Sequence, residues 1–113
     1  MVIIRDALKF EDLRQMAARM FGDLVKVVVD VDRGLIAIDA ELHADLEALL
    51  LQDGSQQRSL WGINLYPDMP GDAFIEFDSL INIRPSQGNR SRGVEDEALR
   101  KHITAVIEQR FVR

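Results

Sequence analysis

The chain has 113 residues, of which 47% are hydrophobic and 29% charged, with a formal net charge of −5 and no cysteine. These values are typical of one folded globular domain and not of a disordered chain. The lack of cysteine excludes disulfides, thiolate metal sites and a cysteine nucleophile. The net negative charge disfavours a broad phosphate-binding surface, so we do not expect duplex nucleic acid as a partner.

No apolar run approaches the roughly 18 residues that a membrane span needs. The first residues also lack the basic start and long apolar stretch of a signal peptide. We therefore expect a cytoplasmic protein without a membrane partner, and we interpret residues 1–113 as a single domain.

The first half of the chain predicts a strand, a helix and then a hairpin. Apolar residues recur at helical spacing before Gly22, which favours a helix end. The turn Asp32-Arg33-Gly34 separates two stretches rich in β-branched residues, which indicates a tight hairpin. The predicted elements are a short edge strand over 2–4, a helix over 9–21 with Phe10, Leu13, Ala17, Met20 and Phe21 on its apolar face, and strands over 24–31 and 35–39.

The second half predicts another helix, two strands and a final helix. Leu42, Leu46, Leu49 and Leu50 form one stripe of a helix that ends at Gly54. A strand follows over 60–66, with Trp61, Ile63 and Leu65 on one face. The longest predicted strand covers 74–84, and we expect four of its side chains, Ile75, Phe77, Ile81 and Ile83, to be among the most buried. The last helix covers 95–111, with an apolar stripe of Leu99, Ile103, Val106 and Ile107.

These elements give the order β-α-β-β-α-β-β-α and predict an α+β fold. We expect a single, mainly antiparallel sheet of about five strands covered by three helices, with ferredoxin-like split βαβ topology in part of it. A domain this small leaves sheet edges to protect, and pairing them in a two-fold homodimer is the simplest solution.

The stretch from Ser79 to Glu95, which we name the arginine loop, is the first candidate site. It contains three arginines and no acid before Glu95, and it leads into the last helix. Its side chains can surround a small anionic ligand such as a phosphate or carboxylate with charge-assisted donors, and Gly88 and Gly93 allow close backbone approach. The predicted ligand-binding residues of the loop are Asn82, Arg84, Gln87, Asn89, Arg90 and Arg92. In the alternative interpretation the arginines are structural and pair with nearby acids.

A polar row on the predicted strand 74–84 is the second candidate. Glu76, Asp78, Asn82 and Arg84 share one face of that strand, beside Asn64 and Tyr66 of the preceding strand. The row leads into the arginine loop, so a pocket made from both would be mixed in charge and suited to a polar or zwitterionic small molecule. We therefore add Glu76 to the predicted ligand-binding residues. The alternative is the solvated side of an antiparallel sheet.

A third candidate lies at the start of the second helix, where His43 and Glu47 are one turn apart. A histidine with a carboxylate can bind a divalent metal or act as an acid–base pair. A histidine at a helix start is more often a surface or capping residue, and no second histidine motif supports a metal. We assign no metal and no cofactor.

The chain also resembles a family of small, uncharacterised bacterial proteins described as a domain of unknown function. Four stretches carry the resemblance: Phe21-Gly22-Asp23-Leu24-Val25-Lys26, Glu41-Leu42-His43-Ala44-Asp45, Leu60-Trp61-Gly62-Ile63-Asn64-Leu65-Tyr66-Pro67 and, above all, Arg84-Pro85-Ser86-Gln87-Gly88-Asn89-Arg90-Ser91-Arg92-Gly93-Val94-Glu95-Asp96. The resemblance implies a stand-alone bacterial domain and brings no catalytic or binding residues with it.

Three classes of function remain open at the level of sequence. We favour a binding module for a small anionic or zwitterionic ligand at the arginine loop. The alternatives are a homo-oligomeric interaction domain with a structural loop, and a small hydrolase or isomerase that uses Glu76 or Asp78 with His43. Whether the protein is an enzyme stays open.

Overall fold

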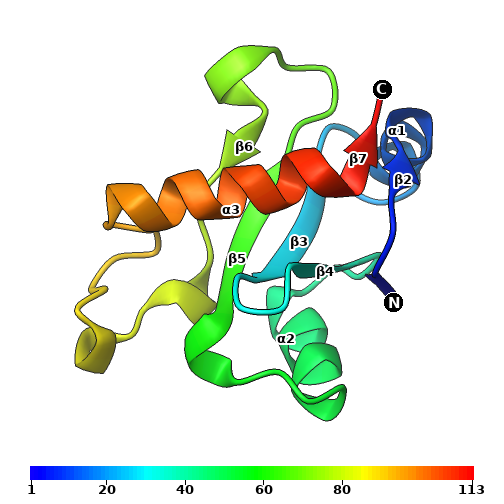
Figure 1. Cartoon of the computed structure of the whole chain (residues 1–113). Coiled ribbons are helices and arrows are strands. Elements are labelled where there is room, and N and C mark those ends of the chain that lie inside the picture. The colour runs from blue at the N-terminus through cyan, green and yellow to red at the C-terminus, as the bar shows by residue number, and fades with distance from the viewer.

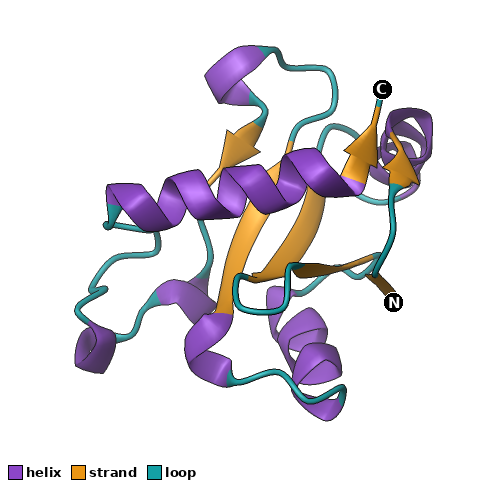
Figure 2. Cartoon of the chain, in the orientation of Figure 1, coloured by secondary structure: helices purple, strands orange, loops and turns teal.

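The computed structural model describes residues 1–113 and has an α+β fold, as predicted (Figures 1 and 2). Five strands form one antiparallel sheet in the order β1-β4-β3-β5-β6. The strands are β1 (Val2–Ile4), β3 (Val25–Asp30), β4 (Leu35–Ile38), β5 (Leu60–Leu65) and β6 (Ile75–Glu76), and the helices are α1 (Phe10–Arg19), α2 (His43–Gln52) and α3 (Glu97–Arg110). A small parallel pair, β2 (Leu8–Lys9) and β7 (Phe111–Val112), joins the start of α1 to the end of α3.

The sheet is buried on both faces, because helices lie on each side of it. Alternate residues of β3 and β5, such as Val27 and Ile63, face a large core shared with α1 and α3. Figure 1 shows α3 crossing the sheet in front of β5 and β3. Val28 points to the opposite face and packs with Leu46 and Leu50 of α2 in a smaller core. The one-sided helix stripes and the alternation in β5 are therefore confirmed, with the helices divided between two faces.

The hairpin between β3 and β4 forms at the predicted turn. Gly34 has a φ of +67°, a conformation that glycine adopts without strain. The carboxylate of Asp30, which is fully buried, accepts hydrogen bonds from the backbone N–H groups of Asp32 and Arg33. The Ser55 hydroxyl donates to the same carboxylate over 2.6 Å, which ties the turn to the segment after α2.

The prediction of a long strand over 74–84 is wrong. Only Ile75 and Glu76 pair with β5, and the chain then leaves the sheet and forms a 3-10 turn over Leu80–Asn82. Ile75, Phe77 and Ile81 are partly buried, and Ile83 is 41% exposed. Ile75, Phe77 and Ile81 pack against the outside of the two cores and are not part of them. The apolar alternation of this stretch therefore does not indicate a buried strand.

Gly62 of β5 explains why the chain can cross over the sheet at this point. A Cβ atom added to Gly62 would lie 2.5 Å from Cβ of Ser79, so the absence of a side chain makes room for the crossing segment. The Ser79 hydroxyl accepts a hydrogen bond from the N–H of Ile81, which begins the 3-10 turn. The crossing segment therefore takes the place that a longer β6 would have filled.

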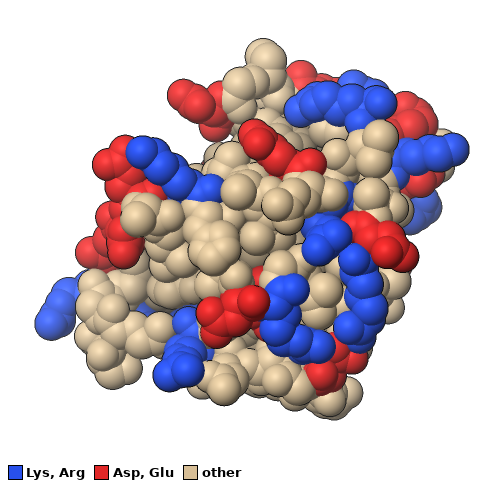
Figure 3. Space-filling view, viewed as in Figure 1, with Lys and Arg blue, Asp and Glu red and all other residues tan.

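Two further residues differ from the predicted helix stripes. Phe21 and Leu42 are both exposed, because α1 ends at Arg19 and α2 begins only at His43. None of the three helices combines the length and the apolar character needed to cross a membrane. On the face of the molecule in Figure 3, basic and acidic side chains are largely interspersed.

Candidate functional site

The Asn82 side chain links the arginine loop to the sheet. It is fully buried, and its amide accepts a hydrogen bond from the N–H of Gly62 (2.8 Å) and donates one to the Gly62 carbonyl (2.9 Å). The same amide nitrogen donates to the carbonyl of Arg92 over 2.9 Å. Because an amide carries both a donor and an acceptor, Asn82 acts as a substitute for a strand neighbour where β6 has ended.

Asn89 holds the second half of the loop in the same way. Its amide nitrogen donates to the carbonyls of Asn82 (2.8 Å) and Gly93 (2.8 Å), and its oxygen accepts from the N–H of Glu95 (2.9 Å). Asn89 is 5% exposed, and its side chain supplies hydrogen-bond partners to backbone groups that would otherwise have none. Both asparagines are therefore structural in this geometry.

Arg84 binds carbonyl groups near the start of β5. Its guanidinium donates to the carbonyls of Gln57 (2.7 Å), Ile81 (3.0 Å) and Leu60, and it stacks over the Trp61 ring at 4.3 Å from the ring centroid. Burial lowers the pKa of Arg84, an effect that the nearby charge of Glu47 partly offsets.

Gln87 assists Arg84 from the other side. Its side-chain oxygen accepts from Arg84 over 3.3 Å, and its nitrogen donates to the carbonyl of Arg58 over 3.1 Å. Both side chains thus hold the loop against the segment that precedes β5.

The backbone amides of the loop are already occupied by a carboxylate of the chain. Glu95 accepts hydrogen bonds from the N–H groups of Arg90 (2.6 Å) and Ser91 (2.9 Å), and these bonds lower its pKa. Asp96 caps α3 by accepting from the N–H groups of Ala98 and Leu99. An external anion would therefore have to displace carboxylates from the donors of this region.

The two remaining arginines of the loop differ in their contacts. The Arg90 guanidinium is exposed and makes no hydrogen bond or ion pair. Arg92 forms an ion pair with Asp78, with 2.7 Å between its Nε and an Asp78 carboxylate oxygen. The side chains of this pair are 56% and 40% exposed, respectively, so solvent and ligands have access to both.

The polar end of the α2-side sheet face, which we name the polar sheet patch, lies next to this ion pair. Lys26 of β3, Asn64 of β5 and Glu76 of β6 stand in register across three strands. The Glu76 carboxylate accepts hydrogen bonds from the amide nitrogen of Asn64 (2.8 Å) and the Tyr66 hydroxyl (3.1 Å). The pKa of Tyr66 is raised, mainly by burial and secondly by its hydrogen bond to Glu76, so its phenol remains a donor.

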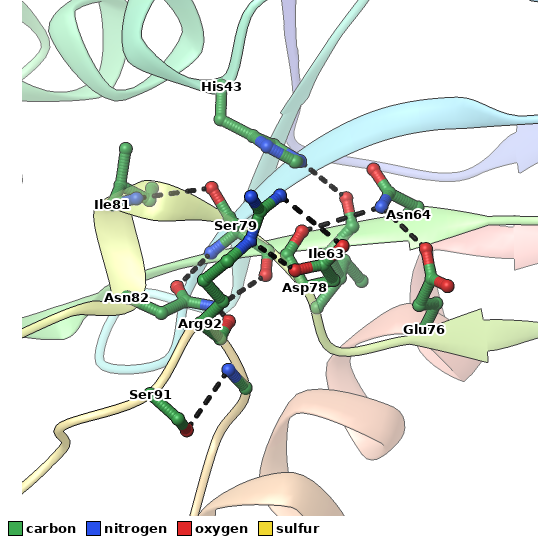
Figure 4. Close-up of polar contacts among 12 residues, drawn as sticks. His43, Ile63, Asn64, Glu76, Asp78, Ser79, Ile81, Asn82, Ser91 and Arg92 are labelled. Atoms are coloured by element: carbon green, nitrogen blue, oxygen red, sulfur yellow. Dashed lines mark hydrogen bonds and ion pairs between the residues drawn. The ribbon is translucent and has the colours of Figure 1, made fainter.

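Asn64 is the one member of the patch with an unmet hydrogen-bonding need. The residue is 6% exposed, and its side-chain oxygen is buried without any partner. Figure 4 shows this oxygen turned away from Glu76, whose carboxylate fixes the amide orientation by accepting from the nitrogen. A buried acceptor without a donor costs about 1–3 kcal/mol, so the site favours a group that donates to it.

His43 borders the patch from α2 and is buried, which corrects its assignment to the surface. Its Nε2 lies 2.7 Å from the carbonyl oxygen of Ile63 and donates to it. Burial lowers the pKa of His43, with Lys26, Asp78 and Arg92 as the neighbouring charges. The ring is therefore neutral near pH 7, with Nδ1 as an acceptor.

The candidate pairing of His43 with a carboxylate is not present in the structure. No hydrogen bond joins His43 to Glu47, Glu76 or Asp78. Burial raises the pKa of Glu47, whose Oε2 atom is buried and has no partner. No group of three or more histidine, cysteine, aspartate or glutamate residues is arranged to hold a metal ion.

The structure thus divides the predicted site residues into two groups and leaves Arg90 outside both. Those that hold backbone groups are Asn82, Arg84, Gln87 and Asn89, whereas Glu76 and Arg92 reach the polar sheet patch and Arg90 stands apart. Sequence reasoning missed Lys26. The alternation of β3 carried the signal, since Lys26 is the one charged residue between Val25 and Val29.

Fold and site together define a small α+β domain with a mixed-charge polar patch on one sheet face. The chain matches the family described as Protein of unknown function (DUF5674) over residues 2–110, and it belongs to this family. Neither the comparison with curated proteins nor the comparison with solved structures gives a match.

Proposed function

We propose that this protein is a binding module for a small zwitterionic ligand at the polar sheet patch. The observation that carries the proposal is the buried, unpartnered side-chain oxygen of Asn64. A ligand ammonium group supplies the donor that this oxygen lacks, and the adjacent carboxylates of Glu76 and Asp78 favour its positive charge. The charged side chains beside Asn64 are exposed or partly exposed and can move aside to admit it.

The charge balance of the patch supports a zwitterion over a simple anion. Two cations, Lys26 and Arg92, stand with two anions, Glu76 and Asp78. The cations can hold a ligand carboxylate while the anions hold its ammonium group, so neither end of the ligand meets an uncompensated charge. The arginine loop contributes Arg92 to this site. The side chains that keep the loop in place are those of Asn82, Arg84, Gln87 and Asn89.

A panel of free amino acids tests the proposal by calorimetry and thermal shift. Each amino acid is compared with its N-acetyl form, which lacks the ammonium group, and with its amide, which lacks the carboxylate. We expect at least one free amino acid to bind and both modified forms to lose about tenfold or more in affinity. Phosphate is included as the anion that the arginine loop alone would favour.

Glu76→Gln is the matched variant, because it keeps the shape and a hydrogen-bond acceptor for Asn64 and Tyr66 while it removes the charge. We expect it to fold normally and to bind the amino acid at least about tenfold more weakly. Arg90→Ala serves as the control, since the Arg90 side chain makes no hydrogen bond or ion pair and the substitution keeps its backbone N–H. Equal affinity of the parent for the free and the N-acetylated ligand would overturn the zwitterion proposal, and binding of phosphate alone would favour an anion site.

A homodimer is the second candidate, and the edge strand β1 supports it. β1 pairs only with β4, so one side of its backbone is open. Met1, which precedes the strand, and Val2, its first residue, are 62% and 41% exposed. Edge-to-edge pairing of two copies would cover both features. Light scattering tests this directly, because a mass of 12.8 kDa at high concentration means a monomer and twice that value a dimer.

A further inference from the structure

A pocket lies on the side of the sheet opposite the polar sheet patch, between α3 and the segment that precedes β6. It is a pocket of about 660 Å³, a size typical of sites for small organic ligands. Four of its eleven lining residues are phenylalanines, namely Phe10, Phe74, Phe77 and Phe111. The carboxylates of Asp72 and Glu108 are the acidic groups among the lining residues.

A cation of the chain itself lines this pocket and lies against two of its aromatic rings. The guanidinium carbon of Arg113 lies 4.4 Å from the centroid of the Phe10 ring and 5.6 Å from that of Phe74. The two rings are 5.5 Å apart and tilted by 36°, so both are within reach of one flat cation. Aromatic faces attract cations through their electron-rich centres, most strongly where water is excluded.

Arg113 is held only weakly in this position. Its side chain forms no ion pair or hydrogen bond, and the residue is exposed, so only its cation–π contacts with the two rings hold the guanidinium there. Asp72 and Glu108 are exposed as well and carry negative charge toward the same opening. The pocket therefore offers both aromatic faces and acidic groups to a cation that binds better than Arg113.

We propose that this pocket binds a small organic cation with a flat or apolar body, such as an amidinium, guanidinium or aryl-ammonium compound, which displaces the Arg113 side chain. The apolar body fills the space beside Ile107 and Phe111, and the cationic group takes the position of the guanidinium over Phe10 and Phe74. The site shares no residue with the polar sheet patch, so this inference does not depend on the function proposed above.

Benzamidine is the probe, because it joins a flat aromatic body to a planar cation. Benzoate, of nearly the same shape but opposite charge, and the neutral benzyl alcohol are the comparison ligands. Binding is measured by calorimetry and by amide chemical-shift changes of Thr104 and Ile107. We expect benzamidine to bind the parent protein at least about tenfold more tightly than benzoate, since ring faces and carboxylates both oppose an anion.

Arg113→Ala separates ligand binding from simple packing. If Arg113 competes with the ligand, its removal should strengthen benzamidine binding by about three- to tenfold, the ratio expected from loss of a competing cation–π contact. Asp72→Asn combined with Glu108→Gln changes only exposed groups and should weaken binding at least about threefold. Arg90→Ala is the control and should leave the affinity unchanged.

Two results would overturn the proposal. The first is that Arg113→Ala binds benzamidine no better than the parent, or not at all. The second is that benzoate or benzyl alcohol binds as tightly as benzamidine, which would mean a merely apolar pocket. Because all these substitutions are at exposed positions, unfolding of the variants is not expected to obscure either outcome.

Discussion

The arginine loop and the polar sheet patch are both rich in polar side chains, but they use them differently. In the loop, Asn82, Asn89 and Arg84 bind backbone groups of distant segments, so their hydrogen-bonding capacity is consumed by the fold. In the patch, Glu76 and Arg92 are themselves exposed and bind other side chains, and the buried oxygen of Asn64 has no partner.

The difference shows that abundance of arginine and asparagine does not by itself indicate a ligand site. A side chain that satisfies a buried backbone group is costly to remove, because the group left behind has no water to replace it. A side chain that binds another exposed side chain can exchange that partner for a ligand at little cost. The two regions should therefore respond very differently to mutation.

The largest effect is expected for Asn82→Ala. The change removes both hydrogen bonds to the backbone of Gly62 and the one to Arg92, and it leaves two buried groups of Gly62 unpaired. We expect a loss of about 3–5 kcal/mol in the free energy of unfolding, since each such group costs about 1–3 kcal/mol. Urea denaturation measures it, with Arg90→Ala as the control within about 0.5 kcal/mol of the parent. A loss of under 1 kcal/mol in Asn82→Ala would contradict a structural role.

The second-largest loss in the free energy of unfolding is expected for Gly62→Ala. The new methyl group would lie 2.5 Å from Cβ and 2.6 Å from Oγ of Ser79. Overpacking of this kind costs about 1–3 kcal/mol. Combining it with Ser79→Gly opens the space again, so we expect the double variant to be more stable than the sum of the single losses by about 1 kcal/mol. Strict additivity in the denaturation measurements would mean that Ser79 does not pack on Gly62.

A smaller, pH-dependent effect is expected from His43. Because burial lowers its pKa in the folded protein, the unfolded chain binds the proton first as the pH falls. The contribution of His43 to stability is therefore complete above about pH 6.5, the usual pKa of histidine, and decreases as the pH falls below it. Denaturation curves between neutral and mildly acidic pH should show a loss that His43→Gln lacks.

His102, which is exposed on α3, provides the control for this measurement. His102→Gln should keep the pH dependence of the parent. The lowered pKa of Glu95 acts in the same direction, but only at more acidic pH where carboxylates titrate. An unchanged pH dependence in His43→Gln would exclude His43 as its source.

The smallest effect on stability is expected for Arg92→Ala. The Arg92 carbonyl, which the substitution retains, is the group that binds Asn82, and the side chain forms only an exposed ion pair with Asp78. We expect a loss of about 0–1 kcal/mol and a correspondingly small decrease in melting temperature. Phosphate or an amino acid that raises the melting temperature of the parent should not raise that of the variant.

A loss of about 3–5 kcal/mol in Arg92→Ala, which is typical of a buried ion pair, would place Arg92 with the structural residues. If the parent were also indifferent to every amino acid and anion tested, the whole loop would be structural. Of the predicted site residues, only Glu76 would then remain in the group that is available to a ligand.

Local periodicity was sufficient to predict most elements of this fold. The alternation of Trp61, Ile63 and Leu65 and the turn at Gly34 depend on neighbours within a few residues, and all are found in the structure. The apolar stripe of α3 is likewise a property of its own sequence, and it predicted that one face would be buried.

The tertiary structure alone decided what the polar side chains do. Asn82 acts on Gly62, twenty residues earlier in the chain, and the absence of a side chain at Gly62 lets residues 79–82 cross the sheet where alternation predicted a strand. His43 is buried because α2 packs on β3 and β4 and places the ring against the carbonyl of Ile63 in the neighbouring strand β5. Sequence periodicity reports only on neighbours within a few residues and does not indicate a hydrogen-bond partner that is distant in the chain. The division of the polar residues into structural and available groups therefore depends on the tertiary structure.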